Sequence, residues 1–179
     1  MEAHEREKLL TDLENGRKAL LNALSGVTED VAARTPAPGK WSALECVEHL
    51  AVSEDYLFSQ IAASCHSHAA MVNKDREALI LARGADRTRP VESPEVGRPA
   101  GRFSTLREAV QRFLASRERT IRFVQNCDED LRSRLTQHPI IGTVNCYETL
   151  LMIAVHPYRH SEQILEIKTA LRIDPIQNL

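Results

Sequence analysis

Four segments of this chain repeat apolar residues at separations of three and four positions, and this periodicity restricts the fold more than any other feature. The first segment, residues 2–26, has leucines at positions 9, 13, 20 and 24. Similar repeats occupy residues 42–64, 105–127 and 145–173. Because an α-helix turns once in about 3.6 residues, such spacing places the apolar side chains on one face. The pattern therefore predicts four long amphipathic helices.

Three of the four segments begin with residues that are typical of a helix start. Each has a Ser, Thr or Asn followed three residues later by a glutamate: Ser42 and Glu45, Thr105 and Glu108, Asn145 and Glu148. The first side chain of such a pair accepts a hydrogen bond from the backbone N–H three residues on, and the glutamate can return one. We therefore expect helices to begin close to residues 42, 105 and 145.

A long connection, residues 84–102, separates the second helix from the third. It follows a weaker helical pattern at residues 74–83 and contains three prolines, three glycines and several arginines without an apolar period. Connections of this length are uncommon in compact domains unless they are functional or mobile, so we expect a crossover or a lid. We predict an all-α fold without strands. It is one domain over residues 1–179, a four-helix bundle in which this crossover lets two neighbouring helices run parallel.

Charge and composition argue against several classes of partner. The formal net charge is −2 with both signs interspersed, so the chain lacks the basic surface of nucleic-acid-binding proteins. The longest apolar run, residues 150–155, is far shorter than a membrane span. The four cysteines stand apart, without a C-x-x-C pair or a signal peptide. We therefore predict a cytoplasmic protein without nucleic-acid or membrane partners.

The last helix carries two histidines, His156 and His160, about one turn apart. Their imidazoles would project from the same face, so one ion could bind both. Neutral imidazole suits zinc, nickel, copper or iron, and three protein ligands with one open position are typical of catalytic metal sites. His49 in the second helix could be the third ligand if the fold brings it across. Gln163 lies on the same stripe as the histidine pair and is a candidate to contact a ligand or the substrate.

Pro157 follows His156 directly and conflicts with a regular helix. Proline lacks the N–H that would bond to the carbonyl of residue 153, and its ring crowds that carbonyl, at a cost of roughly 3 kcal/mol. The sequence leaves two alternatives open: a kink that aims His156, or a helix that breaks at this point.

Three motifs, in this order, resemble the DinB/YfiT-like superfamily of bacterial four-helix bundles. They are WSALECVEHL at residues 41–50, HPIIG at residues 138–142 and HPYRHSEQI at residues 156–164. The resemblance implies a metal triad of His49, His156 and His160 between the second and fourth helices. It also implies a divalent metal ion, most often nickel or zinc, and frequently a homodimer.

The resemblance leaves the reaction open. We predict a metal-dependent hydrolase that activates water against a small-molecule substrate. One alternative is a transferase of low-molecular-weight thiols of the bacillithiol or mycothiol type. Others are a non-catalytic metal-binding stress-response module and a bundle without metal. His66 and His68 form a weaker candidate for a second metal cluster, and the arginines of residues 84–102 are expected to be solvated.

Overall fold

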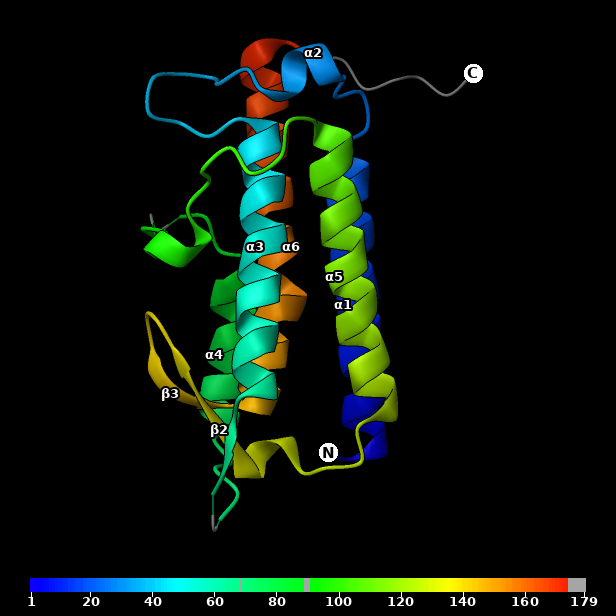
Figure 1. The fold of residues 1–179 in the computed structure, drawn as a ribbon, viewed down its shortest axis with the longest axis vertical. Coiled ribbons are helices and arrows are strands. Elements are labelled where there is room, and N and C mark those ends of the chain that lie inside the picture. Colours follow the sequence, from blue (N-terminus) through cyan, green and yellow to red (C-terminus); the bar gives the residue numbers. More distant parts are fainter. Residues whose placement is uncertain (68, 89–90, 174–179) are drawn as a thin grey trace.

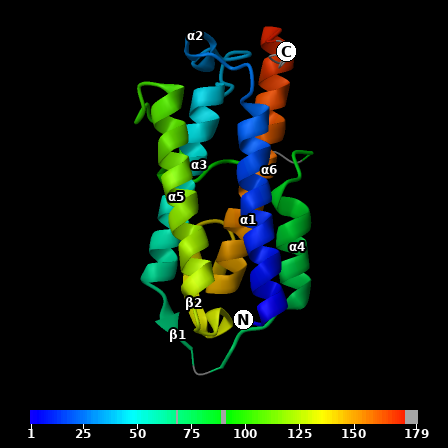
Figure 2. The same ribbon diagram turned by 90° about the vertical axis from the view of Figure 1, so that its right-hand side faces the viewer.

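The computed structural model describes residues 1–67, 69–88 and 91–173, and it confirms the all-α architecture (Figure 1). Four long helices form the bundle: α1 (Ala3–Ala23), α3 (Ala43–Ala62), α5 (Leu106–Asn126) and α6 (Cys146–Leu171). α1 and α6 run side by side in one direction, and α3 and α5 run side by side in the other (Figures 1 and 2). The predicted crossover between α3 and α5 is what makes these two neighbours parallel. α3 and α6 are antiparallel and also in contact.

Four shorter helical elements connect or cover the bundle: α2 (Glu29–Ala32), α4 (Lys74–Gly84), and the 3-10 turns η1 (Glu95–Gly97) and η2 (Leu131–Ser133). α4 confirms the weak helical pattern at residues 74–83 and packs against α6. η1 packs against α3. The chain between α3 and α5 therefore packs against the outside of the bundle, with α4 on α6 and η1 on α3 (Figure 1). None of the helices in the described part of the chain combines the length and apolarity needed to cross a membrane.

The expectation of a fold without strands is wrong in one place. A small antiparallel sheet, in the order β1-β2-β3, lies near the end of the bundle where α6 begins: β1 (Cys65–His66), β2 (Arg134–His138) and β3 (Gly142–Asn145). In β2 only Thr136 is buried, so these short strands carry no apolar alternation that a sequence pattern could show. The turn of the β2–β3 hairpin ends at Gly142, whose φ of +75° favours glycine.

The predicted capping residues lie at the helix starts. Ser42 and Glu45 exchange hydrogen bonds at the start of α3, as do Asn145 and Glu148 at the start of α6. Thr105 accepts from the backbone N–H of Glu108 as expected. The Glu108 carboxylate accepts from the N–H of Ser104 instead of Thr105, so this pair is only half reciprocal.

The interior of the bundle has two apolar clusters with a polar layer between them. One cluster includes Leu13 and Leu150, on the side of the sheet, and the other includes Val47 and Phe113. In the layer, Arg117 of α5 is fully buried and pairs with Glu54 of α3, with Nη2 2.9 Å from the carboxylate. The layer also joins α1, because Arg117 Nη1 donates to the Leu13 carbonyl at 3.0 Å. The guanidinium thus joins α5 to both α3 and α1.

The same guanidinium resolves the conflict at Pro157. α6 continues through Pro157 without a break, so the alternative of a broken helix is wrong. The carbonyl of Ile153 lacks its helical donor because Pro157 has no N–H. Arg117 Nη2 donates to that carbonyl at 3.0 Å and replaces the missing bond. Gly16 of α1 lies against this part of α6, where a Cβ would come within 2.7 Å of the Ala154 carbonyl oxygen.

Candidate metal centre

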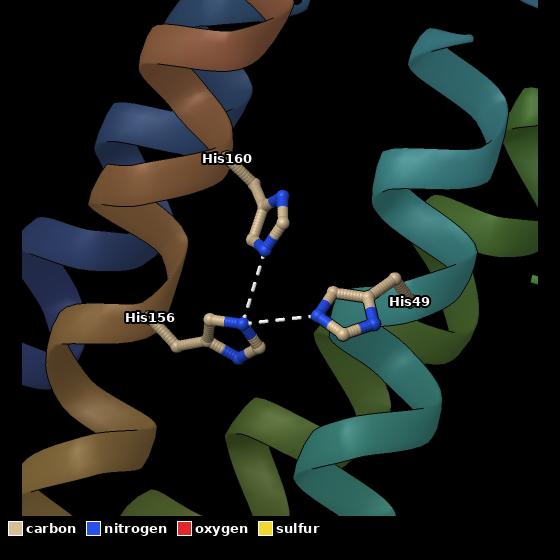
Figure 3. Close-up of side chains that lie close together, drawn as sticks. All are labelled: His49, His156 and His160. Atoms are coloured by element: carbon tan, nitrogen blue, oxygen red, sulfur yellow. Dashed lines mark hydrogen bonds between the residues drawn. The ribbon is translucent and has the colours of Figure 1, made fainter. Parts of the chain in front are cut away.

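The three histidines point toward one another across the antiparallel pair α3 and α6 (Figure 3). Nε2 of His156 lies 3.1 Å from Nε2 of His49 and 3.0 Å from Nε2 of His160. Potential ligand atoms of the three rings all lie within 4.8 Å of one another. Two ligands about 2.1 Å from a tetrahedral ion are about 3.4 Å apart, which is similar. The arrangement therefore fits one divalent ion shared by His49, His156 and His160.

Hydrogen bonds at the far side of two rings fix which nitrogen faces the centre. Nδ1 of His49 lies 2.6 Å from the carbonyl oxygen of Gly97, and Nδ1 of His160 lies 3.0 Å from Oε1 of Gln163. Both oxygens are acceptors, so Nδ1 carries the proton in each ring and Nε2 presents its lone pair. This is the usual arrangement of metal-binding histidines. If His156 Nε2 carries a proton, that one proton is shared between the lone pairs of His49 and His160. A cation at the centre would instead bind the Nε2 atoms of all three rings.

The site keeps its imidazoles in the neutral form that binds metals. The side chains of His49 and His160 are buried, and His156 is half-buried. Burial lowers the pKa of all three rings, and it holds the pKa values of His156 and His160 well below the usual histidine range. The other two imidazoles lower the pKa of His156 further, while the Gly97 carbonyl partly opposes the effect of burial on His49. No proton needs to leave these rings near neutral pH before a metal binds.

An indole ring covers one side of the cluster. The ring centroid of Trp41 lies 4.9 Å from that of His49 and 6.0 Å from that of His160, and it stacks on the latter. Ser42 directly after it caps α3, so the first motif of the sequence both starts the helix and covers the site. Trp41 is the chain's single tryptophan and can report on this site by fluorescence.

Gly97 is a functional residue that the sequence did not reveal. Its carbonyl holds His49, and a Cβ at this position would lie 2.9 Å from Ser53 Oγ and 3.3 Å from the His49 ring. Glycine therefore allows the close approach of η1 to α3. The sequence showed one of several glycines in a proline-rich connection, which does not indicate a partner 48 residues away.

Gln163 lies where its spacing suggested, beside His160, and it connects the site to the crossover. Its Oε1 also accepts from Nη1 of Arg87 at 3.1 Å, and Arg87 makes two bonds to the carboxylate of Glu166, at 2.9 and 2.7 Å. The expectation that the arginines of residues 84–102 are merely solvated is therefore wrong for Arg87. This side chain fixes the oxygen that orients His160.

A cleft of about 1040 Å³ opens onto the three histidines, between α3, α4, α6, the crossover and the tip of the β2–β3 hairpin. Pockets that bind small molecules usually have volumes of about 300–1,000 Å³. All three imidazoles line this cleft, so the converging nitrogens are accessible from it. Ser53 and Tyr56 of α3 line it as well, whereas the carboxylate of Glu45, on the same stripe, is used by the helix cap.

Other sequence candidates do not form a second centre. His66 is exposed on β1, and the three histidines of this cluster are the one group of potential metal ligands found within residues 1–67, 69–88 and 91–173. His68 lies outside the described residues. His138 is the last residue of β2, and its Nδ1 accepts from the N–H of Ile140 in the turn that follows. Cys46 and Cys146 are buried, and burial raises the pKa of both thiols.

Comparison with known proteins places the chain in a family. No curated protein matches it. Among solved structures it is similar to YfiT from Bacillus subtilis, described as a probable metal-dependent hydrolase with an unusual four-helix bundle topology. The two share 15% sequence identity with a TM-score of 0.60, over 97% of this chain and 91% of that one, and at this identity the likeness establishes the fold. The sequence profile of the DinB superfamily matches residues 12–164, so the chain belongs to the DinB superfamily.

Proposed function

We propose that this protein is a metal-dependent hydrolase in which His49, His156 and His160 hold a divalent ion, zinc or nickel. The observation that carries the proposal is the convergence of three Nε2 atoms on the wall of an open cleft. The description of the B. subtilis neighbour as a probable metal-dependent hydrolase supports it. Nitrogen ligands of this kind suit either metal.

An ion held by these three imidazoles would supply Lewis acidity, which for zinc brings the pKa of a bound water to about 7 and so makes a nucleophile available near neutral pH. The protein's own residues position and shield the site. Gly97 and Gln163 hold two of the rings, Trp41 covers them, and the cleft admits the substrate. Glu92 is the only described carboxylate that lines the cleft, and it pairs with Arg98. The proposal therefore does not include a free carboxylate as general base.

Metal content and turnover of matched variants test this function. Purified protein should contain about one equivalent of zinc or nickel, and His156→Ala should lose it together with any hydrolysis of an ester panel. His66→Ala, an exposed histidine away from the cleft, is the control and should keep both. Full metal content and activity in the His156→Ala variant would contradict the proposal.

Thiol transfer is a second candidate, and the size of the cleft favours it. A volume of about 1040 Å³ lies at the upper limit for small-molecule pockets and can accept two reactants. Adding bacillithiol or mycothiol to metal-loaded protein with an electrophile such as monobromobimane separates the two reactions. Thioether formation without ester hydrolysis would favour the transferase.

A purely structural ion makes a different prediction. If the ion only tied α3 to α6, chelation would lower the free energy of unfolding strongly, and no substrate in either panel would react. Cytoplasmic location and homodimer formation remain predictions, and light scattering of the purified protein tests the second.

A further inference from the structure

The orientation of the Gln163 amide decides which nitrogen of His160 faces the other histidines. Its Oε1 lies 3.0 Å from Nδ1 of His160, on the side of the ring that points away from them (Figure 3). An amide has an acceptor end and a donor end of similar size, so it can turn over. With its oxygen toward the ring, it accepts the proton of Nδ1 and leaves the lone pair on Nε2. With its NH2 group toward the ring, it would place the proton on Nε2, where a metal would have to bind.

Arg87 allows only one of these two orientations. Its Nη1 lies 3.1 Å from the same Oε1 atom of Gln163. A guanidinium has five N–H donors and no acceptor, so it is compatible only with the oxygen end of the amide. The NH2 end would bring two donors together. The oxygen is therefore held in the position where it accepts from both Arg87 and His160.

The position of Arg87 is itself fixed, through its side chain and through its backbone. Nε and Nη2 donate to the two carboxylate oxygens of Glu166 on α6, at 2.9 and 2.7 Å. The backbone carbonyl of Asp86, the preceding residue, accepts from Nη1 of Arg159 on the same helix. The side chain of Arg87 is only 26% exposed. Arg87 therefore approaches Gln163 in a defined orientation.

We propose that Arg87 is a positioning residue for the metal centre and that it sets the tautomer of His160 through Gln163. Arg87 belongs to the crossover, which also provides the Gly97 carbonyl that accepts from His49 on the opposite helix. A backbone carbonyl cannot exchange its acceptor for a donor, whereas the Gln163 amide can, so only the α6 side needs such a residue. This inference rests on the metal site of the proposed function, whatever bond that site hydrolyses.

The charge of Arg87 alone would have the opposite effect on metal binding. A guanidinium near the centre repels a divalent cation, so its removal would by charge alone strengthen binding. Loss of an orienting partner of a metal-binding histidine instead weakens binding, typically by about 10–100-fold. A fall in metal affinity after removal of Arg87 therefore reports the tautomer and not the charge.

Zinc affinity, measured by competition with a chromogenic chelator, tests the inference in matched variants. Arg87→Met removes the donors, and it should bind zinc about tenfold more weakly than the unmodified protein. Arg87→Lys keeps a side chain that can only donate and should recover part of the loss. The control is Arg83→Met, which removes the same charge from the same cleft. Arg83 is exposed and forms no side-chain hydrogen bond or ion pair with any residue that the structure describes, so this variant should bind zinc at least as tightly as the unmodified protein.

A second background separates control of the tautomer from simple anchoring of the crossover. In Gln163→Glu both side-chain oxygens are acceptors, so the proton stays on Nδ1 of His160 with or without Arg87. Adding Arg87→Met should therefore cost little zinc affinity in this background. Long-range ¹H–¹⁵N NMR spectra of the metal-free protein measure the tautomer directly. His160 should carry its proton on Nδ1 in the unmodified protein and on Nε2 in a substantial fraction of Arg87→Met molecules.

Unchanged or tighter zinc binding in Arg87→Met would overturn the inference, as would an unchanged tautomer of His160. An equal loss of affinity with and without Gln163→Glu would show that Arg87 only anchors the crossover, and the inference would again be wrong. Failure of the proposed function gives a different result. If the unmodified protein binds neither zinc nor nickel, that function is contradicted, while the NMR comparison of the metal-free proteins still decides the role of Arg87.

Discussion

Two polar clusters lie within the same bundle, and their hydrogen bonding differs in a way that separates structure from function. Around Arg117, the donors meet acceptors inside the protein: the Glu54 carboxylate and the carbonyls of Leu13 and Ile153. Around His156, the Nε2 lone pairs of His49 and His160 both face Nε2 of His156, which can offer them at most one proton. The first cluster is complete and closed to solvent, whereas the second keeps unsatisfied imidazole lone pairs and lines a cleft. A buried polar group with all its bonds made contributes to the fold, whereas one with lone pairs left over indicates a ligand.

Removing the guanidinium of the closed cluster should have the largest effect. Arg117→Met leaves Glu54 buried without its partner, and burial already raises the pKa of this carboxyl. Two backbone carbonyls lose a donor as well. We expect the free energy of unfolding to fall by about 3–5 kcal/mol, measured by urea denaturation.

The matched control on α5 is Arg112→Ala, because Arg112 pairs with Asp55 at the surface and is 52% exposed. Its loss should cost less than about 1 kcal/mol. Equal effects of the two substitutions would show that the Arg117 cluster does not stabilise the bundle in the way its burial indicates.

Gly97→Ala should affect the open cluster more than the fold. The new Cβ would meet Ser53 Oγ and the His49 ring, which displaces the carbonyl that orients His49. Loss of such an orienting contact typically lowers metal affinity by about 10–100-fold, here measured by competition with a chromogenic chelator. Adding Ser53→Ala removes the closest clash at 2.9 Å and should recover part of the affinity. Unchanged affinity in Gly97→Ala would show that the Gly97 carbonyl is dispensable.

Acidification should destabilise the metal-free protein through the open cluster. The folded-state pKa values of His49, His156 and His160 are lowered, so below pH 6.5 the unfolded chain binds more protons than the folded one. Stability therefore falls as the pH drops below 6.5, by about 1.4 kcal/mol per pH unit for each histidine until its folded pKa is reached. Urea denaturation at pH 7.5 and 5.5 measures this difference. It should be smaller in His156→Phe, and an identical pH dependence would contradict the assignment.

The smallest effect concerns the link between the two clusters. In the Arg117→Met background, Pro157→Ala restores an N–H that can bond to the Ile153 carbonyl. We expect this substitution to be about 1 kcal/mol more favourable there than in the unmodified protein, where Arg117 already serves that carbonyl. A double-mutant cycle of unfolding free energies measures the coupling. Additive effects would mean that Arg117 does not compensate for the proline.

The elements with strong local signals could be predicted from the sequence. The four long helices follow from apolar spacing, and the Ser42 cap fixes the start of α3. His156 and His160 lie one turn apart on one helix, so their proximity follows from helix geometry alone. His49 required the resemblance to a known family, because nothing in spacing or composition relates it to α6.

The remainder depends on tertiary contacts that leave no local pattern. The sheet strands are two to five residues long and lack an apolar alternation. The role of Gly97 depends on where the crossover meets α3, and that of Arg117 on a carbonyl deprived of its donor by Pro157 on another helix. The sequence shows that Pro157 removes a helical hydrogen bond, but it does not show that Arg117 replaces that bond.

The crossover is attached to α3 at two consecutive residues. Beside His49, which donates to Gly97, the buried carboxylate of Glu48 accepts from the backbone N–H groups of Ala100 and Gly101. Contacts that hold the crossover against α3 therefore also stabilise the orientation of the His49 ring in which Nε2 faces the other two histidines. Because such coupling is reciprocal, a ligand bound at Nε2 would stabilise the docked crossover. Insertions or deletions between residues 91 and 97 would therefore retune metal affinity while leaving every ligand unchanged, and metal binding would in turn slow proteolysis of this segment.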